Sequence, residues 1–306
     1  MYRPLMQDHS AQLGPVLYAC AAHVTEGSFE KTDIGLSQIK RLTSIVDGPL
    51  QRLSLIIADS LARRLLCPIQ GFAGALIHPS DYFEQSVLQT ARCNLTKLCP
   101  YISTGFVTIN RAILESMEVE KVVRIVDLSC STAPSHGSGS SSFMTFMGDK
   151  QDADHNALLF CDRFVEALNY YAALFDWFHA LVAANPRRAD ELARVERMIL
   201  GEEIKNILVC EGVHRPERHE RLSQWAMHMG RYGFDHVPLS FRAIWEGNQK
   251  LMSFGLNGCQ SKVESDCLLL CWGYRHLYSI SAWRPHKGSA SGSREHILVQ
   301  PQRQMI

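Results

Sequence analysis

The chain has 306 residues, of which 46% are hydrophobic and 20% are charged, a composition that argues against a disordered or fibrous protein. Its basic and acidic residues balance at a net charge of +0, so any contact with DNA has to be local or come through a partner. The ten scattered cysteines include no Cys-x-x-Cys pair, which argues against a zinc ribbon or a dithiol redox site. We expect no secretory leader. We also expect no membrane-spanning helix, because no stretch reaches roughly 20 apolar residues. Without a leader, unpaired cysteine thiols favour a reducing compartment.

The N-terminal segment is expected to form amphipathic helices. Its clearest apolar stripe begins after Pro49, a favourable first-turn residue, and comprises Leu50, Leu53, Ile57, Leu61 and Leu65. Such a stripe usually packs against the rest of its domain, and the alternative is an exposed face that binds a partner. Two more helices are expected, over 82–98 and 107–117.

A change of period follows these helices. The string "KVVRIVDL" at 121–128 is a nearly continuous apolar run, which is typical of a strand buried on both faces of a parallel sheet. The next stretch, 129–142, is rich in Ser, Gly and Pro and predicts a loop. The sequence therefore predicts an α/β fold in which helices cover both faces of a sheet.

The second half mixes helical patterns with short β-prone runs. Three helices are expected, over 160–182, 189–200 and 220–230. The string "KNILVCEG" from Lys205 predicts a second buried strand. Three β-prone runs, at 261–263, 267–272 and 277–283, are separated by turn-forming residues and predict an antiparallel meander. The residues after Arg284 are mostly small and polar and predict a disordered tail.

The string "RIVDLSCSTAP" is the strongest candidate for cofactor chemistry. It looks like the first motif of S-adenosylmethionine-dependent methyltransferases, whose Asp-x-Gly-x-Gly turn lets the backbone approach the cofactor. Asp127 is present, but Ser129 and Ser131 stand where the glycines belong, and their side chains block that approach. The enzyme alternative would bind its cofactor through Asp127 and Asp149. The favoured interpretation is a catalytically silent relative of that fold, with no catalytic residue and no cofactor.

A second candidate is a metal site within the string "CEGVHRPERHE". Its ligands would be Cys210, Glu211, His214, His219 and Glu220. The spacing fits no zinc pattern, because structural zinc sites pair ligands two to four residues apart. The favoured interpretation is a polar loop without metal, in which the charged residues pair with one another and cap the following helix: Arg215, Glu217, Arg218 and Glu220.

Taken in order, the segments resemble the GRAS domain of plant regulators related to Scarecrow and the DELLA proteins. "QRLSLIIADSLARRLL" resembles the first leucine-rich region, and residues 123–127 resemble the VHIID motif, with Arg124 in place of the usual His. "DADHN" and "RFVEALNYYAALFD" are similar to the PFYRE region. The SAW region keeps a W-x7-G and a W-x10-W spacing. Residues that match the family's motifs are Asp127, Arg163, Tyr171, Arg218, His219, Glu220, Trp225, Gly233, Trp272 and Trp283.

The resemblance implies one GRAS domain over 13–284 with a Rossmann-like, methyltransferase-like core and a C-terminal antiparallel meander. Its parts would be a leucine-rich helical cap (13–66), helices and the VHIID-like strand (67–128), a linker (129–151) and the PFYRE/SAW-like region (152–284), followed by a disordered tail (285–306). The family normally has a long block, with a second leucine-rich region and several strands, where this chain has about twenty residues. Because a parallel sheet gains strands only through crossovers, the central sheet should be reduced.

The resemblance also implies a non-enzymatic nuclear co-regulator that acts through other proteins in hormone signalling, including gibberellin signalling, and in root development. The expected partners are zinc-finger factors of the indeterminate-domain type and other GRAS or DELLA proteins, in homo- or heterodimers, with indirect or weak DNA contact. The expected partner-binding residues lie in the cap: Leu17, Leu50, Leu53, Ile57, Leu61 and Leu65. Two alternatives stay open, a methyltransferase-like enzyme and a partly folded interaction fragment.

Overall fold

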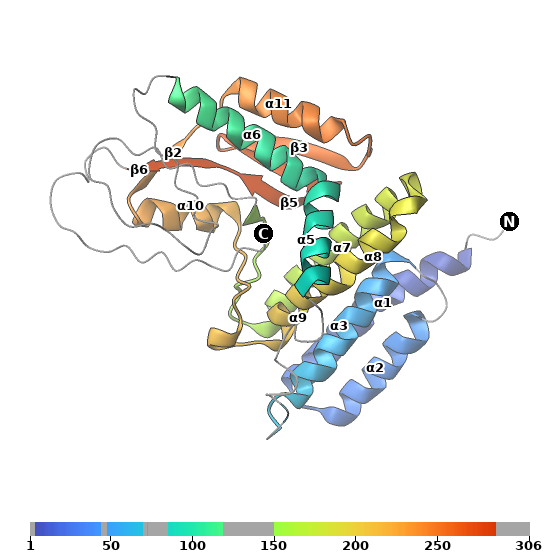
Figure 1. Cartoon of the computed structure of the whole chain (residues 1–306). Coiled ribbons are helices and arrows are strands. Elements are labelled where there is room, and N and C mark those ends of the chain that lie inside the picture. The colour runs from blue at the N-terminus through green and yellow to red at the C-terminus, as the bar shows by residue number, and fades with distance from the viewer. Residues whose placement is uncertain (1–3, 44–47, 70–71, 73–84, 119–149, 286–306) are drawn as a thin grey trace. The chain divides into compact units, whose positions relative to one another are not determined.

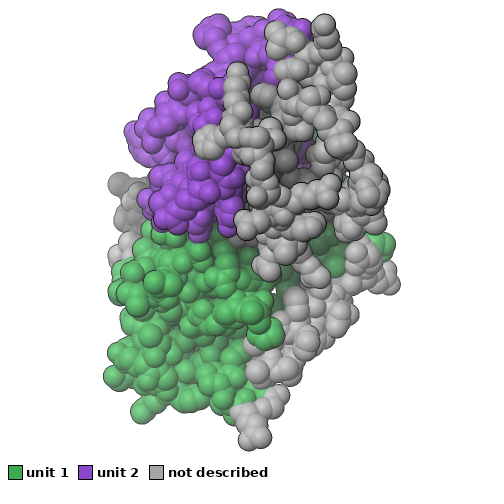
Figure 2. Space-filling view, turned by 90° about the vertical axis from the view of Figure 1, so that its left-hand side faces the viewer, with its two compact units in different colours: residues 1–95, 153–219 green, residues 96–152, 220–306 purple. Residues whose placement is uncertain are grey.

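The computed structural model describes residues 4–43, 48–69, 72, 85–118 and 150–285. These residues form two compact units, each made from two separate stretches of the chain (Figures 1 and 2). Unit 1 comprises residues 1–95 and 153–219, and unit 2 comprises residues 96–152 and 220–306. The VHIID-like strand, the serine-rich loop, Asp127, Asp149 and the C-terminal tail lie outside the described residues.

Unit 1 contains helices and helical turns but no strand among its described residues. Its elements are α1 (Pro4–Thr25), α2 (Phe29–Thr43), α3 (Pro49–Leu66), most of α5 (Gln85–Leu98), α7 (Phe160–Ala184), the short 3-10 turn η1 (Pro186–Arg188), α8 (Ala189–Val195), the π-helical turn η2 (Glu196–Leu200), α9 (Gly201–Val209) and the 3-10 turn η3 (Gly212–His214). The helices expected from the N-terminal stripe and from the pattern at 160–182 are confirmed, and Pro49 begins α3 in its first turn.

The core of unit 1 is built around α7. This helix buries a run of large aromatic side chains, and Trp177 and Phe178 are in ring contact with centroids 4.5 Å apart. Leucine and isoleucine side chains of α1 and α3 are buried in the same unit. On α3, Arg52 forms a two-pronged ion pair with Glu196, both bonds 2.9 Å long, at the start of the π-helical turn. Apolar burial and this ion pair together position α9 beside α3 and α7.

Unit 2 combines helices with two small antiparallel sheets. Its elements are α6 (Pro100–Met117), β1 (Lys150–Gln151), α10 (Leu222–Arg231), β2 (Phe234–Val237), α11 (Phe241–Met252), β3 (Cys259–Glu264), β4 (Cys267–Trp272), β5 (Arg275–Ile280) and β6 (Ala282–Pro285). The four-stranded sheet has the order β1-β5-β4-β3, and β2 pairs with β6. The expected antiparallel meander is therefore confirmed.

The turn between β3 and β4 has two residues, Ser265 and Asp266, with φ angles of 49° and 58°. Two successive positive φ angles belong to the type I′ turn, which matches the twist of a hairpin. The turn fixes the register in which Glu264 faces Cys267. With this register, β4 presents five buried residues in a row, Cys267 to Cys271.

The fold class predicted from the sequence is confirmed only in its coarse form. The described residues show a mixed helical structure with small C-terminal antiparallel sheets, and the predicted parallel core falls on residues outside the description. The strand predicted for "KNILVCEG" is wrong, because its first five residues form the second half of α9 and the other three follow that helix. Ile204, Ile207 and Leu208 have helical spacing and are all buried, and a short apolar run fits a buried helix as well as a strand.

No described helix combines the length and the apolar character needed to span a bilayer.

Gly247 of α11 packs closely against α6, and a substitution at this position tests the contact between the two helices. A Cβ atom at this position would lie 2.1 Å from Thr108 Oγ1. We expect Gly247→Ala to lower the free energy of unfolding by about 1–3 kcal/mol, since overpacking outweighs the better helix propensity of alanine. Urea unfolding measures this loss. In a Thr108→Ala background the oxygen is gone, so the same substitution should cost clearly less; an equal cost in both backgrounds would contradict the contact.

Candidate functional site

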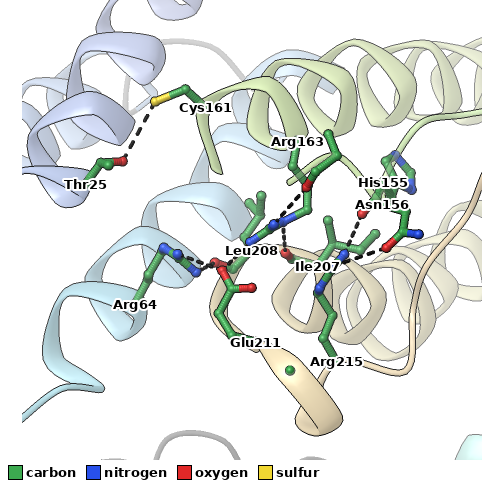
Figure 3. Close-up of polar contacts among 12 residues, drawn as sticks. Thr25, Arg64, His155, Asn156, Cys161, Arg163, Ile207, Leu208, Glu211 and Arg215 are labelled. Atoms are coloured by element: carbon green, nitrogen blue, oxygen red, sulfur yellow. Dashed lines mark hydrogen bonds and ion pairs between the residues drawn. The ribbon is translucent and has the colours of Figure 1, made fainter. Parts of the chain in front are cut away.

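The most connected polar site in unit 1 lies where α9 ends. Arg163, from the first turns of α7, is 1% exposed. Its Nε donates to the Ile207 carbonyl at 3.0 Å, one Nη donates to the Ala157 carbonyl at 3.1 Å, and the other Nη donates to the Glu211 carboxylate. One buried guanidinium thus joins the start of α7, the end of α9 and the loop that follows α9 (Figure 3).

A second guanidinium reaches the same place from α3. Arg64 donates to the Leu208 carbonyl at 3.0 Å and to Glu211 Oε1 at 2.8 Å, and its guanidinium lies 3.9 Å from the centre of the Phe160 ring. The last carbonyls of a helix have no partner within the helix, and the helix dipole makes that end negative. Arg64 and Arg163 therefore cap α9 with two cations.

Two more arginines complete what we call the arginine cluster: Arg64, Arg163, Arg215 and Arg218. Arg215 donates to the His155 carbonyl at 2.6 Å and to Asn156 Oδ1 at 3.5 Å, and Arg218 donates to the same Oδ1 at 3.1 Å. Arg218 also donates to the Gly212 carbonyl at 2.6 Å. Burial, followed by the charges of Arg163 and Arg218, lowers the pKa of Arg215 to about 10. The guanidiniums are thus close enough to repel one another.

Glu211 is the carboxylate that the cluster holds. Burial works to raise its pKa, but the hydrogen bonds and charges of Arg64 and Arg163 outweigh burial, so the pKa is lowered below its usual value. The side chain is 51% exposed. An ionised carboxylate at the surface is therefore bonded to a guanidinium in the interior.

An imidazole between two carboxylates lies at the end of the same loop. His219 Nε2 is 2.9 Å from Glu203 Oε1 and 3.4 Å from Glu217 Oε2. Burial works to lower the pKa of His219, but the hydrogen bonds and charges of the two glutamates outweigh it and raise the pKa to about 9. Burial and the charge of Glu203 also raise the pKa of Tyr171 well above its usual value.

This His–Glu–Glu group is also the one place among the described residues where three metal-ligand atoms gather, all within 4.8 Å of one another. The raised pKa favours a protonated His219 that forms an ion pair with the two glutamates at neutral pH. A metal ion at this place would have to displace that proton. His155 stacks on the Tyr171 ring at 5.6 Å and meets the His219 ring edge-on at 5.3 Å, which closes the group with aromatic contacts.

The metal candidates chosen from the sequence do not assemble. Cys210 is buried and His214 is exposed, and His219 instead pairs with Glu203 and Glu217. The expected pairing within the polar loop is also corrected. Glu220 binds His228 at 2.9 Å, and the N-terminus of α10 is capped by Asp152, whose Oδ1 accepts from the Leu222 amide at 2.8 Å. Arg215 donates to acceptors on the segment before α7, and Arg218 donates to Asn156 there and to carbonyls of its own loop.

The motif residues fall into two groups. Arg163, Tyr171, Arg218 and His219 all belong to the polar site of unit 1 just described. The others lie in unit 2: Glu220, Trp225, Gly233, Trp272 and Trp283. The Trp283 indole is 4% exposed and donates to Ser281 Oγ at 2.8 Å, and Gly233 has a φ of 81°, which favours glycine.

The six cap residues expected to bind partners differ in exposure. Leu17, Leu53, Ile57 and Leu61 are at most 1% exposed, while Leu50 and Leu65 are partly exposed. The apolar residues that reach the surface of the cap are others: Tyr18, Phe29, Ile34 and Leu55, which are 49–61% exposed. The leucine stripe thus serves the core of unit 1, and the accessible apolar surface lies beside it.

Sequence reasoning missed Arg64 and Glu203 as parts of the site. Arg64 lies on α3 outside the leucine stripe, on a face that is normally solvated. It nevertheless contacts the end of α9, more than a hundred residues later in the chain. Glu203 lies between the helix expected over 189–200 and the strand expected from Lys205, in residues for which the sequence predicted no element. No local pattern marks either residue, since their partners come from other segments of the chain.

Comparisons with known proteins agree in the family they point to. The model of the GRAS domain family matches residues 13–134 and 140–284. Scarecrow-like protein 3 of Arabidopsis thaliana is 45% identical over 138 residues, covering 45% of this chain and 28% of the relative. DELLA protein GAI1 of Vitis vinifera is 24% identical over 379 residues, covering 91% of this chain and 62% of the relative. The chain thus spans less than two thirds of the length of these relatives.

The longer alignment also shows the internal shortening. Its 379 positions exceed the 306 residues of the whole chain, so the DELLA relative contains segments that are absent here. The crystal structure of SCL7 from Oryza sativa has the same fold, with a TM-score of 0.63 at 20% sequence identity, covering 89% of this chain and 99% of that one. With the family model matching nearly all of residues 13–284, the chain belongs to the GRAS domain family and carries a shortened GRAS domain.

Proposed function

We propose that this chain is a plant transcriptional co-regulator that works in the nucleus by binding other proteins and catalyses no reaction. The observation that carries the proposal is the family match over residues 13–134 and 140–284, because Scarecrow-like and DELLA proteins are plant regulators. The proposed setting is hormone signalling, including gibberellin signalling, and root development. The proposed partners are zinc-finger factors of the indeterminate-domain type and other GRAS or DELLA proteins, with DNA contact weak or indirect. Micromolar binding of S-adenosylmethionine in calorimetry would contradict the non-enzymatic assignment.

The helical cap is the proposed partner surface. Tyr18, Phe29, Ile34 and Leu55 expose large apolar side chains on α1, α2 and α3, and apolar side chains of this kind anchor protein interfaces. Leu50 and Leu65 contribute where they are partly exposed, and the buried members of the stripe contribute by holding the three helices together.

A charge placed on this surface tests the proposal. We expect Leu55→Asp to reduce the capture of a purified indeterminate-domain protein or a DELLA protein at least tenfold, because a carboxylate would be desolvated in the interface. Co-purification with the full chain measures the capture, and circular dichroism checks that the helices persist. Tyr274→Asp, on the fully exposed turn between β4 and β5, is the matched control and should bind normally. Equal capture by the Leu55 variant would reject the cap as the partner surface.

The finer fold assignment belongs to this proposal as well. We propose one shortened GRAS domain with a reduced Rossmann-like, methyltransferase-like core. A single cooperative thermal transition of the purified chain would support it, and a broad transition would favour the alternative of a partly folded interaction fragment.

A further inference from the structure

The arginine cluster carries more positive charge than its surroundings neutralise. Among the described residues, Glu211 is the one carboxylate that accepts a hydrogen bond from any of the four guanidiniums, and its donors are Arg64 and Arg163. The remaining acceptors are neutral oxygens, chiefly the backbone carbonyls of the α9 end and the neighbouring loops. The cluster also has donors to spare, since Arg215 Nε is buried and has no hydrogen-bond partner in the described part of the chain.

Two of the four guanidiniums reach the surface. Arg64 has a side chain that is 20% exposed, and Arg218 is partly exposed where it donates to the Gly212 carbonyl. Between them lies the exposed segment 211–214, which begins with the half-exposed Glu211. Glu211 thus occupies the position at which an outside anion would meet the cluster.

We propose that the arginine cluster binds a phosphoserine or phosphothreonine group of a partner protein, with Arg64 and Arg218 contacting the phosphate and Glu211 moving aside. A phosphate monoester carries about −1.5 to −2 charges at neutral pH and three acceptor oxygens, whereas Glu211 supplies one charge. One guanidinium can donate two parallel hydrogen bonds to two oxygens of the same phosphate group. The buried Arg163 and Arg215 add to the positive field at this place.

The proposal deepens the proposed function, since it rests on that function in taking the ligand to be part of a protein. A phosphate-dependent site formed by Arg64 of the cap and by arginines of the PFYRE-like region would make partner binding responsive to phosphorylation. The site uses Arg64 but not Leu55, which lies about two and a half turns earlier on α3. The Leu55→Asp test and the phosphate test can therefore fail independently of each other.

The test titrates the full chain with inorganic phosphate, and with a phosphoserine peptide flanked by glycines and its unphosphorylated form, at constant ionic strength in calorimetry. We expect the phosphopeptide and phosphate to bind, and the unphosphorylated peptide not to bind. Arg64→Gln and Arg218→Gln should weaken binding at least tenfold, and Arg64→Lys should weaken it less. Arg63→Gln is the matched control, because Arg63 neighbours Arg64 on α3 but pairs with Asp59 at 2.7 Å, and it should bind normally.

Glu211→Gln separates this proposal from a purely structural role of the cluster. Removing the competing carboxylate should strengthen phosphopeptide binding several-fold, whereas a structural network predicts no such gain. Absence of phosphopeptide binding, binding of inorganic phosphate alone, or equal losses for the Arg63 and Arg64 variants would each overturn the proposal.

Discussion

Replacing Arg163 with methionine is expected to lower the free energy of unfolding by about 2–5 kcal/mol, because two backbone carbonyls would each lose a charged donor, at about 1–3 kcal/mol apiece. The substitution removes the donors to the Ile207 and Ala157 carbonyls and one of the two guanidiniums on Glu211. Methionine fills much of the same volume, so the loss reports the missing hydrogen bonds and charge rather than a cavity. Urea unfolding followed by circular dichroism measures it.

The matched control is Arg187→Met on η1, where the arginine is exposed. It should change the free energy of unfolding by no more than about 0.5 kcal/mol. A loss below about 1 kcal/mol for the Arg163 variant would show that the capping of α9 contributes little to stability.

Stability should also fall as the pH rises through about 9, the pKa of His219 in the folded protein. This pKa lies above the ordinary value of 6.5, so the folded state holds the proton more tightly than the unfolded state does. The stabilisation is therefore complete below pH 6.5 and lost above pH 9. The shift corresponds to roughly 2–4 kcal/mol, measured as the difference in unfolding free energy between about pH 6 and pH 10.

Other groups titrate in the same interval, so the comparison is made with His219→Gln, which keeps a hydrogen-bond donor but no titrating ring. The variant should be less stable than the parent at pH 6 and should lose less stability by pH 10. Parallel pH profiles for the two proteins would refute the ion pair with Glu203 and Glu217.

The sequence predicted those elements whose signal is local. The stripe of α3 and the aromatic repeat of α7 are long and strongly periodic, and the β-prone runs at 261–283 are divided by turn residues, so each pattern admits one reading. The apolar run that begins at Lys205 is too short for its period to distinguish a strand from a helix, and the predicted strand is in fact the end of α9. The helix α11 was not predicted, in part because Phe241, Trp245 and Met252 are exposed and blur its amphipathic pattern.

The polar site could be predicted only in part. The GRAS-like motifs singled out Arg163, Tyr171, Arg218 and His219, and the structure brings all four into one site. Their partners could not be foreseen. Arg64 donates to the Leu208 carbonyl, and Arg163 donates to the Glu211 carboxylate, each far away in the sequence. Such hydrogen bonds depend on tertiary packing rather than on spacing in the sequence.

The two-part construction of unit 1 has a consequence for how the protein is made. The ribosome releases α1, α2 and α3 long before α7 and α9, and at about 5–20 residues per second the interval between Leu66 and Val209 lasts on the order of ten seconds. During that time the nascent helices present Leu53, Ile57 and Leu61 to the cytosol, although all three are buried in the finished unit. Chaperones that shield apolar surfaces therefore have their longest opportunity at the N-terminal end of this chain.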